Sequence, residues 1–328
     1  MAKANANINV LFGEESFLLD EYEDAILQAT IGNDPSPFDL SVFDLEETPI
    51  QTALEDAETL PLMNEQKVIL LKHPFFLTSL KPKGAPDHDL DALTQYINNP
   101  SPYTVLIFRA GYAKLDERKK LVKQLKKLGT IKEASPLRED ELYQWIEQTA
   151  KKEGSLIDPG ARNALLNRIG PSLRMLREEI RKLSLYGGEQ ISLEMVENLV
   201  PRTLDQNLFA LMDDLLQKNA TGAIQRYHDL LRQKEEPIKL LLLLASQARA
   251  MLQVNELLRK GYGQSQVAKR LKMHPYRVKV ISGQLKKAQA DFPSMLSDMG
   301  RLDVQMKTGK IDKVLGLELF LLKYTGAA

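Results

Sequence analysis

Residues 8–19 read Ile-Asn-Val-Leu-Phe-Gly-Glu-Glu-Ser-Phe-Leu-Leu, and this stretch decides the fold. Its first five residues, Ile8–Phe12, form a short apolar run that predicts a buried strand. The turn Gly13-Glu14-Glu15 follows, and Ser16 is a residue type that caps helices. After Ser16, apolar side chains recur at helical spacing. A strand, a tight turn and a helix in this order are typical of an α/β domain with a parallel sheet.

The sequence up to Pro136 repeats this alternation. Apolar runs at 40–45, 68–71, 104–108 and 131–134 predict four more strands. The run 68–71 is continuously apolar, as expected of a strand buried on both faces. Thr48-Pro49-Ile50-Gln51 predicts a helix that begins with a capping box and a proline in its first turn. Gly129 is expected to end the last helix before the fifth strand.

After Pro136 the pattern becomes helical and strands are no longer predicted. The glycine pair Gly187-Gly188 and several prolines divide these helices into a short group and a longer one, with a linker beginning at Pro201. The predicted fold class is therefore α/β followed by all-α. We expect three domains: an α/β domain at 1–136, a small helical domain at 137–203 and a larger helical domain at 204–328.

Composition narrows the classes of function. The 328 residues contain 44 Lys and Arg and 44 Asp and Glu, so any electrostatic partner must be sought in local segments. The absence of cysteine excludes disulfides, thiolate metal sites and cysteine nucleophiles, and it fits a reducing compartment. No apolar run is long enough to span a membrane, and Ile8–Phe12 is too short for a signal-peptide core. We expect a cytoplasmic protein without membrane contact.

The sequence carries no recognisable catalytic or cofactor-binding motif. A phosphate-binding loop needs small residues and a lysine between the first strand and helix, but Glu14 and Glu15 occupy that turn. The only Gly-Lys pair, Gly309-Lys310, lacks a following hydroxyl. The four histidines are far apart and none has metal-site spacing. We expect no enzyme activity, no cofactor and no metal.

Two segments stand out as candidate contact sites. Leu62 and Met63 lie in a connection between a predicted helix and a buried strand, where an apolar pair can plug into a partner's pocket. The alternative is that both side chains fold back into the core, which the residues alone favour.

The second segment, residues 257–290, contains nine Lys or Arg and no Asp or Glu. Its candidate DNA contacts are Lys269, Arg270, Lys272, Tyr276 and Arg277, with Tyr276 as a stacking side chain. The pattern also resembles a helix-turn-helix, so a DNA-binding regulator is an alternative function. A solvated basic face is the third reading.

Several runs together resemble a known family, and the resemblance covers essentially the whole chain. They are residues 10–19 (Val-Leu-Phe-Gly-Glu-Glu-Ser-Phe-Leu-Leu), 46–50, 68–74, 114–120, 236–239 and 261–264. Their order and spacing are similar to those of the delta subunit of the bacterial DNA polymerase III clamp loader, in its Gram-positive form.

The resemblance implies an AAA+-like domain without a P-loop, a helical lid domain and a helical collar domain for oligomerisation. It implies a non-catalytic subunit that binds the sliding clamp (the beta subunit) and holds it open for loading onto primed DNA. The other implied partners are the delta prime and gamma/tau subunits. The family's clamp-binding apolar pair corresponds to Leu62 and Met63, where Met63 replaces the usual aromatic residue.

Overall fold

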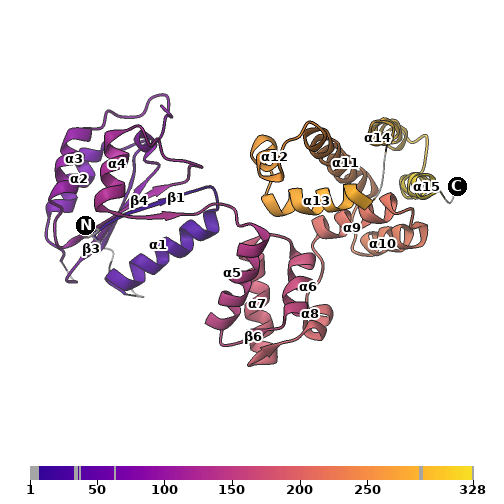
Figure 1. Cartoon of the computed structure of the whole chain (residues 1–328), viewed down its shortest axis with the longest axis horizontal. Helices are drawn as coiled ribbons and strands as arrows, with labels where there is room; N and C mark the ends of the chain where they lie inside the picture. The colour runs from indigo at the N-terminus through magenta and orange to yellow at the C-terminus, as the bar shows by residue number, and fades with distance from the viewer. Residues whose placement is uncertain (1–6, 33–35, 37, 63, 288–290, 327–328) are drawn as a thin grey trace. The chain divides into compact units, whose positions relative to one another are not determined.

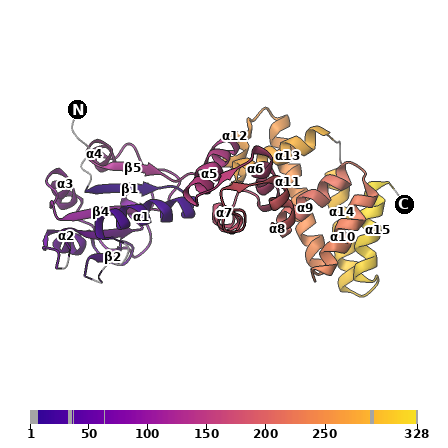
Figure 2. The ribbon, with the colours of Figure 1, turned by 90° about the horizontal axis from the view of Figure 1, so that it is seen from below.

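The computed structural model describes residues 7–32, 36, 38–62, 64–287 and 291–326, and the chain forms two compact units. The first unit is residues 1–136 and the second is residues 137–328. Figures 1 and 2 show a sheet covered by helices in the first unit and helices almost throughout the second. The predicted fold class, α/β followed by all-α, is confirmed. The further division at residue 203 stays a prediction.

The first unit is built on a five-stranded parallel sheet in the order β2-β3-β4-β1-β5. The strands are β1 (Ile8–Phe12), β2 (Leu40–Asp44), β3 (Lys67–Lys72), β4 (Thr104–Ala110) and β5 (Thr130–Glu133). All five were predicted, with small differences at their ends. The central strands β1, β3 and β4 are buried almost throughout, because helices pack on both faces of the sheet.

Helices α2, α3 and α4 cover one face of this sheet and α1 covers the other (Figure 1). They are α1 (Ser16–Ile31), α2 (Ile50–Glu58), α3 (Leu90–Asn98) and α4 (Lys120–Leu128). A short 3-10 turn, η1 (Phe75–Leu77), follows β3, and α3 was not predicted from the sequence. Alternate strand residues, such as Ile69 and Leu71, pack with helix residues such as Ile50 in one buried cluster.

Two predicted helix starts differ from the structure. The capping box at Thr48-Pro49-Ile50-Gln51 is wrong, because Pro49 occupies the N-cap and makes no side-chain cap. For α1 the N-cap is Glu15 rather than Ser16. Gly129 ends α4 as predicted.

In its described residues, the second unit has helices and one two-stranded parallel bridge, between β6 (Leu156–Ile157) and β7 (Gln190–Ile191), which the sequence did not predict. Its first helices are α5 (Glu139–Lys152), α6 (Pro159–Ile169), α7 (Leu173–Gly187) and α8 (Leu193–Leu199). The remainder are α9 (Leu204–Leu216), α10 (Ala220–Arg232), α11 (Pro237–Arg259), α12 (Gln264–Leu271), α13 (Pro275–Lys287), α14 (Phe292–Lys307) and α15 (Lys313–Thr325).

Helices α9–α15 share one buried cluster, in which Tyr227 and Phe292 are among the largest fully enclosed side chains. Leu240, Leu244 and Met251 place one face of the long helix α11 in this cluster. Among the residues described, no helix is both long and apolar enough to cross a membrane.

Candidate functional site

The turn after β1, where a phosphate-binding loop would lie, is closed by its own side chains and backbone. The Glu15 carboxylate accepts a hydrogen bond from the Phe17 amide at the start of α1 (3.3 Å). Gly13 has a φ of 140°, and a Cβ at this position would overlap the Ala134 carbonyl group. A helix N-terminus binds phosphate through free amides. In this chain the Glu15 carboxylate already accepts from one of the amides that a phosphate would need.

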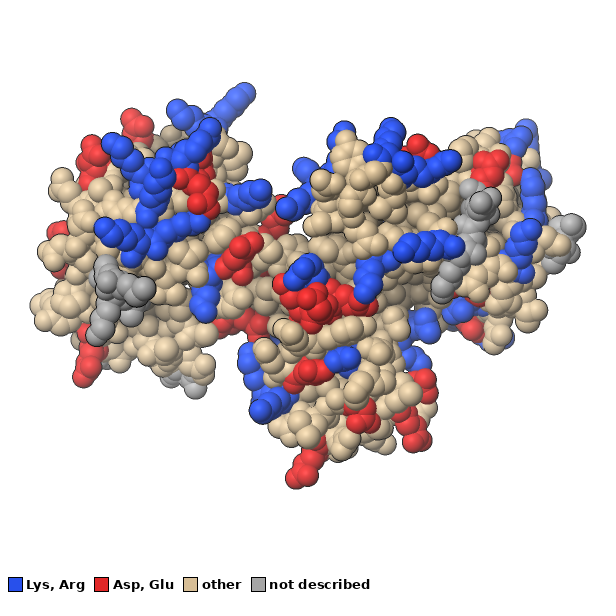
Figure 3. All heavy atoms as spheres, viewed as in Figure 1, with Lys and Arg blue, Asp and Glu red and all other residues tan. Residues whose placement is uncertain are grey.

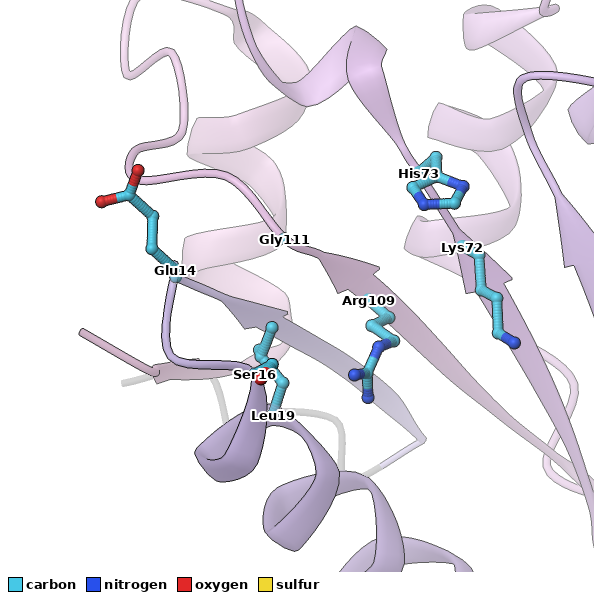
Figure 4. A pocket seen from close by; sticks show the side chains of 8 residues that line it. Glu14, Ser16, Leu19, Lys72, His73, Arg109 and Gly111 are labelled. Carbon is cyan, nitrogen blue, oxygen red and sulfur yellow. The ribbon is translucent and has the colours of Figure 1, made fainter. Parts of the chain in front are cut away.

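A hollow of about 200 Å³ remains beside this turn, lined by Glu14, Ser16, Lys72, His73 and Arg109 among others (Figure 4). Its volume is below the ~300–1,000 Å³ of pockets that enclose small-molecule ligands. The Arg109 guanidinium is held by the carboxylates of Asp20 and Glu23, each at 2.6 Å. These ion pairs raise the pKa of Arg109 against the opposing effect of burial. The Arg109 cation in this hollow is therefore already paired and is not free to bind a nucleotide phosphate.

The connection between α2 and β3 presents apolar side chains to solvent. Leu60 is 68% exposed and Leu62 is 74% exposed, so the core alternative for Leu62 is not what the structure shows. Met63 lies outside the described residues. An exposed leucine at the tip of a loop suits insertion into a pocket of a partner.

The base of this loop is clamped by Lys67, the first residue of β3. Its side chain is only 4% exposed, and its ammonium group donates to the Asp56 carbonyl, to the Asp56 carboxylate (2.8 Å) and to the Thr59 hydroxyl (2.6 Å). Burial acts to raise the pKa of Asp56, but the bonds from Lys67 and its neighbours outweigh it and the pKa is lowered. Lys67 therefore joins the end of α2 to the strand that follows the loop.

Two more contacts fix the returning side of the loop. The Asn64 side-chain amide donates to the buried carboxylate of Asp39 at 2.7 Å, and the Gln66 side-chain amide donates to the Pro102 carbonyl at 3.1 Å. The loop is thus held at its base while Leu62 stays in solvent. Asp39, Asn64 and Lys67 were not predicted as part of this site. A lysine at the start of a buried strand does indicate an ion-pair or hydrogen-bond partner, because lysine is rarely buried unpaired.

In the second unit, Lys269, Arg270 and Lys272 are exposed at the end of α12. Lys272 ends the helix in the left-handed conformation, with a φ of 51°. The Arg270 guanidinium lies 5.3 Å from the Tyr262 ring centroid and donates to its hydroxyl at 3.2 Å. The three cations lie within four residues of one another and face solvent.

The structure corrects the interpretation of Tyr276 as a stacking side chain. Tyr276 is only 6% exposed, and its hydroxyl donates to the Asn167 side-chain carbonyl at 3.3 Å. Burial raises its pKa to about 12. Arg277 is half-buried, because its guanidinium lies 5.1 Å from the Phe209 ring centroid and donates to Gln247 at 3.2 Å. The exposed set is therefore Lys269, Arg270 and Lys272.

No cluster of three or more metal-ligating side chains occurs among the described residues. The histidines have local partners instead. His73 pairs with the Asp44 carboxylate (2.9 Å), and His88 bridges two backbone groups in the first unit.

Comparison with known proteins decides the family. A family model described as "DNA polymerase III, delta subunit" matches residues 10–135, and one described as "DNA polymerase III delta subunit, C-terminal domain" matches residues 205–324. The Bacillus subtilis DNA polymerase III subunit delta is 41% identical over 316 residues, which cover 95% of this chain and 91% of that protein. The chain belongs to the DNA polymerase III delta subunit family.

The structure agrees with this membership of the delta family. The solved structure of the Bacillus subtilis DNA clamp loader delta protein matches with a TM-score of 0.86 and 39% identity, over 99% of this chain and 96% of that one. A probable delta subunit from Aquifex aeolicus is 23% identical over 318 residues, which cover 95% of this chain and 89% of that protein. The predicted family is confirmed, and the alternative of a helix-turn-helix regulator gains no support.

Proposed function

We propose that this delta subunit binds the sliding clamp through Leu62 and Met63 and holds it open for loading onto primed DNA. The observation that carries the proposal is the exposure of Leu62 on a loop whose base is fixed by Lys67 and Asn64. A fixed loop loses less conformational freedom when it binds, which favours affinity. Insertion favours the open clamp only to the extent that the loop binds that state more tightly than the closed one.

We also propose that the subunit is non-catalytic and takes no cofactor. It would work in the cytoplasm within a loader that contains delta prime and gamma/tau subunits, with residues 137–203 as the lid domain and 204–328 as the collar domain. Support for a non-hydrolysing role comes from the turn at Gly13–Ser16, where Glu15 caps α1 and no lysine is present.

Lys269, Arg270 and Lys272 form the proposed DNA contact of the second unit. Their exposure at the end of α12 supports contact with phosphates, which carries no preference for base sequence.

The clamp proposal is tested by replacing Leu62 and Met63 together with Ala and titrating the purified chain against the sliding clamp. Buried interface anchors are worth about 2 kcal/mol or more each, so clamp affinity should fall at least about a hundredfold. The melting temperature should hardly change, because Leu62 packs against little in the free protein.

Leu185→Ala is the matched control, since Leu185 is 82% exposed on α7 in the other unit. It should leave both clamp affinity and melting temperature unchanged. If the double variant keeps full clamp affinity, or if it melts early because core contacts are lost, the proposed anchor is wrong.

A further inference from the structure

Charge is unevenly divided along the first unit. Residues 1–111 contain 18 Asp or Glu and six Lys or Arg, whereas residues 112–132 contain eight Lys or Arg and two Asp or Glu. The second stretch includes the whole of α4. Lys and Arg side chains gather over this helix in Figure 3.

The lysines of α4 form its solvent face. Leu121, Val122 and Leu125 are buried against the sheet, and the lysines before, between and after them in the helix are exposed. These exposed lysines are Lys120, Lys123, Lys126 and Lys127. Lys114 and Arg118 before the helix and Lys132 on β5 are also exposed, and we call these seven residues the α4 basic surface.

The segment before α4 is hydrogen-bonded to the turn after β3. The Lys119 ammonium donates to the Phe76 carbonyl at 2.9 Å, and the Asp116 amide donates to the Leu77 carbonyl at 2.8 Å. These bonds hold the segment before α4 against η1. Lys81 and Lys83, both exposed, lie a few residues beyond η1.

Most of this charge is not neutralised within the chain. The two carboxylates of residues 112–132 are already paired, Asp116 with Arg118 and Glu117 with Lys126. The bonds from Arg118 lower the pKa of Asp116 to about 2, so it stays ionised at neutral pH. Among the described residues, Lys114, Lys120, Lys123 and Lys127 have no ion-pair partner.

Helix stability does not account for where these lysines lie. Cations stabilise the last turn of a helix, which explains Lys126 and Lys127. Lys120 and Lys123 lie in the first turn, where the positive end of the helix dipole opposes a cation and no acidic residue offsets it. Because Lys120 and Lys123 do not stabilise the helix, we infer that these two charges serve binding rather than folding.

The chemistry of the surface favours nucleic acid over a protein partner. Protein interfaces are depleted in lysine and are centred on apolar or aromatic anchors. Seven cations, six of them lysines, make up the α4 basic surface, and no large apolar side chain is exposed between residues 104 and 132. Clustered Lys and Arg side chains neutralise the evenly spaced phosphates of a nucleic-acid strand, and this contact needs no apolar anchor.

We propose that the α4 basic surface is a second DNA-binding surface, which contacts the phosphate backbone without reading sequence. It lies in the first unit and shares no residue with Lys269, Arg270 and Lys272 of the second unit. The proposal is also independent of the clamp anchor, because Leu62 and Met63 are not part of the α4 basic surface.

The test measures how the affinity of the full chain for DNA depends on salt. Lys120, Lys123 and Lys127 are replaced together with Gln, and binding to a mixed-sequence duplex is followed by fluorescence anisotropy between 50 and 200 mM salt. Each lost duplex contact lowers the log–log slope by about 0.9, so three contacts lower it by about 2.7. The wild type should then lose roughly forty-fold more affinity than the variant over this range. A single-stranded probe should show a smaller change of about 0.7 per contact.

Controls separate a local contact from a general effect of charge. Lys151, Lys310 and Lys313 are exposed in the second unit, and their triple Gln variant makes the same change in net charge. It should keep the wild-type slope, as should the Arg variant of Lys120, Lys123 and Lys127. Because two first-turn cations are removed, the Gln variant of α4 should melt no earlier than the wild type.

Two results would overturn the proposal. One is an unchanged slope in the α4 variant, and the other is a slope change no larger than in the control triple. Weakened binding to the clamp or to another loader subunit with an unchanged DNA slope would assign the surface to a protein partner instead.

Discussion

Single residues decide what the turn after β1 can bind. Glu15 takes the amide at the start of α1 that a phosphate would need, and Glu14 adds a second negative charge beside it. We therefore expect a calorimetric titration of the purified chain with ATP and magnesium to give no saturable heat. Saturable binding would contradict the proposal that the subunit takes no nucleotide cofactor.

His88 is a second residue whose position matters, because it holds the start of α2 from a distant loop. Its Nδ1 accepts from the Ile50 amide at 3.0 Å, and its Nε2 donates to the Leu45 carbonyl at 3.0 Å. Only a neutral ring can do both. Burial lowers the pKa of His88, although the bond to Leu45 and the charge of Asp87 oppose this shift.

This arrangement predicts acid sensitivity at the start of α2. The unfolded chain takes up a proton near pH 6.5, while the folded ring resists it, so the stabilisation is full above about pH 6.5. It is lost as pH falls through the lower pKa of the folded state. Hydrogen exchange of residues 46–58, corrected for intrinsic rates, should show protection falling with pH in the wild type. His88→Gln should show a weaker pH dependence, and equal profiles would refute the role of His88.

Among the helices and strands, those whose burial restricts the residue type were predicted best from the sequence. The strands at 68–71 and 104–108 were predicted because helices on both faces of the sheet leave almost only apolar residues in them. Helix α3 was missed, although its N-cap Asp89 accepts from the amides of Asp91 and Ala92. A nine-residue helix after a proline-rich stretch has too little periodicity to stand out.

The candidate site was harder to predict because it depends on exposure and on distant partners. An apolar pair looks the same in sequence whether it packs in the core or contacts a partner. The exposure of Leu62 could therefore be expected only from the resemblance of the whole chain to the delta family. The correction at Tyr276 has the same cause, since its partner Asn167 lies 109 positions away in sequence.

Lys67 gives a prediction about the element that carries Leu62. Lys67→Met keeps the buried stem but leaves the Asp56 and Thr59 oxygens without their donor. A hydrogen bond from a charged group contributes about 1.5–3 kcal/mol, and water can reach the half-buried Asp56 and the exposed Thr59, so the first unit should lose no more than about 1.5–3 kcal/mol of stability. The freed loop should also bind the clamp several-fold more weakly, because more of its freedom is lost on binding.

Thr104→Val is the matched control for this variant. The Thr104 hydroxyl donates to the Ala57 carbonyl at 2.7 Å, so it holds the same end of α2 without touching the loop. We expect a loss of stability with unchanged clamp affinity. If Lys67→Met and Thr104→Val weaken clamp binding equally, Lys67 has no special part in presenting the loop.

For the whole molecule, a net charge of zero conceals separate charged regions. The acidic residues of the first unit, the α4 basic surface and the exposed cations of α12 cancel only in the total. Two units with separate cores can therefore each carry a basic surface.

The basic surface of the second unit is tested by replacing Lys269, Arg270 and Lys272 together with Gln. The slope of log affinity for duplex DNA against log salt should fall by up to about 0.9 for each lost phosphate contact, with no change in sequence preference. Anisotropy titrations with two unrelated duplexes provide the measurement. An unchanged slope would leave these residues as a solvated face.

The closed turn at Gly13–Ser16 bears on how this chain could evolve. A path to nucleotide binding would have to replace Glu15, which removes the cap of α1 and costs about 0.5–2 kcal/mol before any phosphate is bound. Gly13 could not change either, because any side chain would collide with the end of the sheet at Ala134. Each of these first steps would cost stability before any binding is gained, so selection on folding alone would disfavour the appearance of a nucleotide site at this turn.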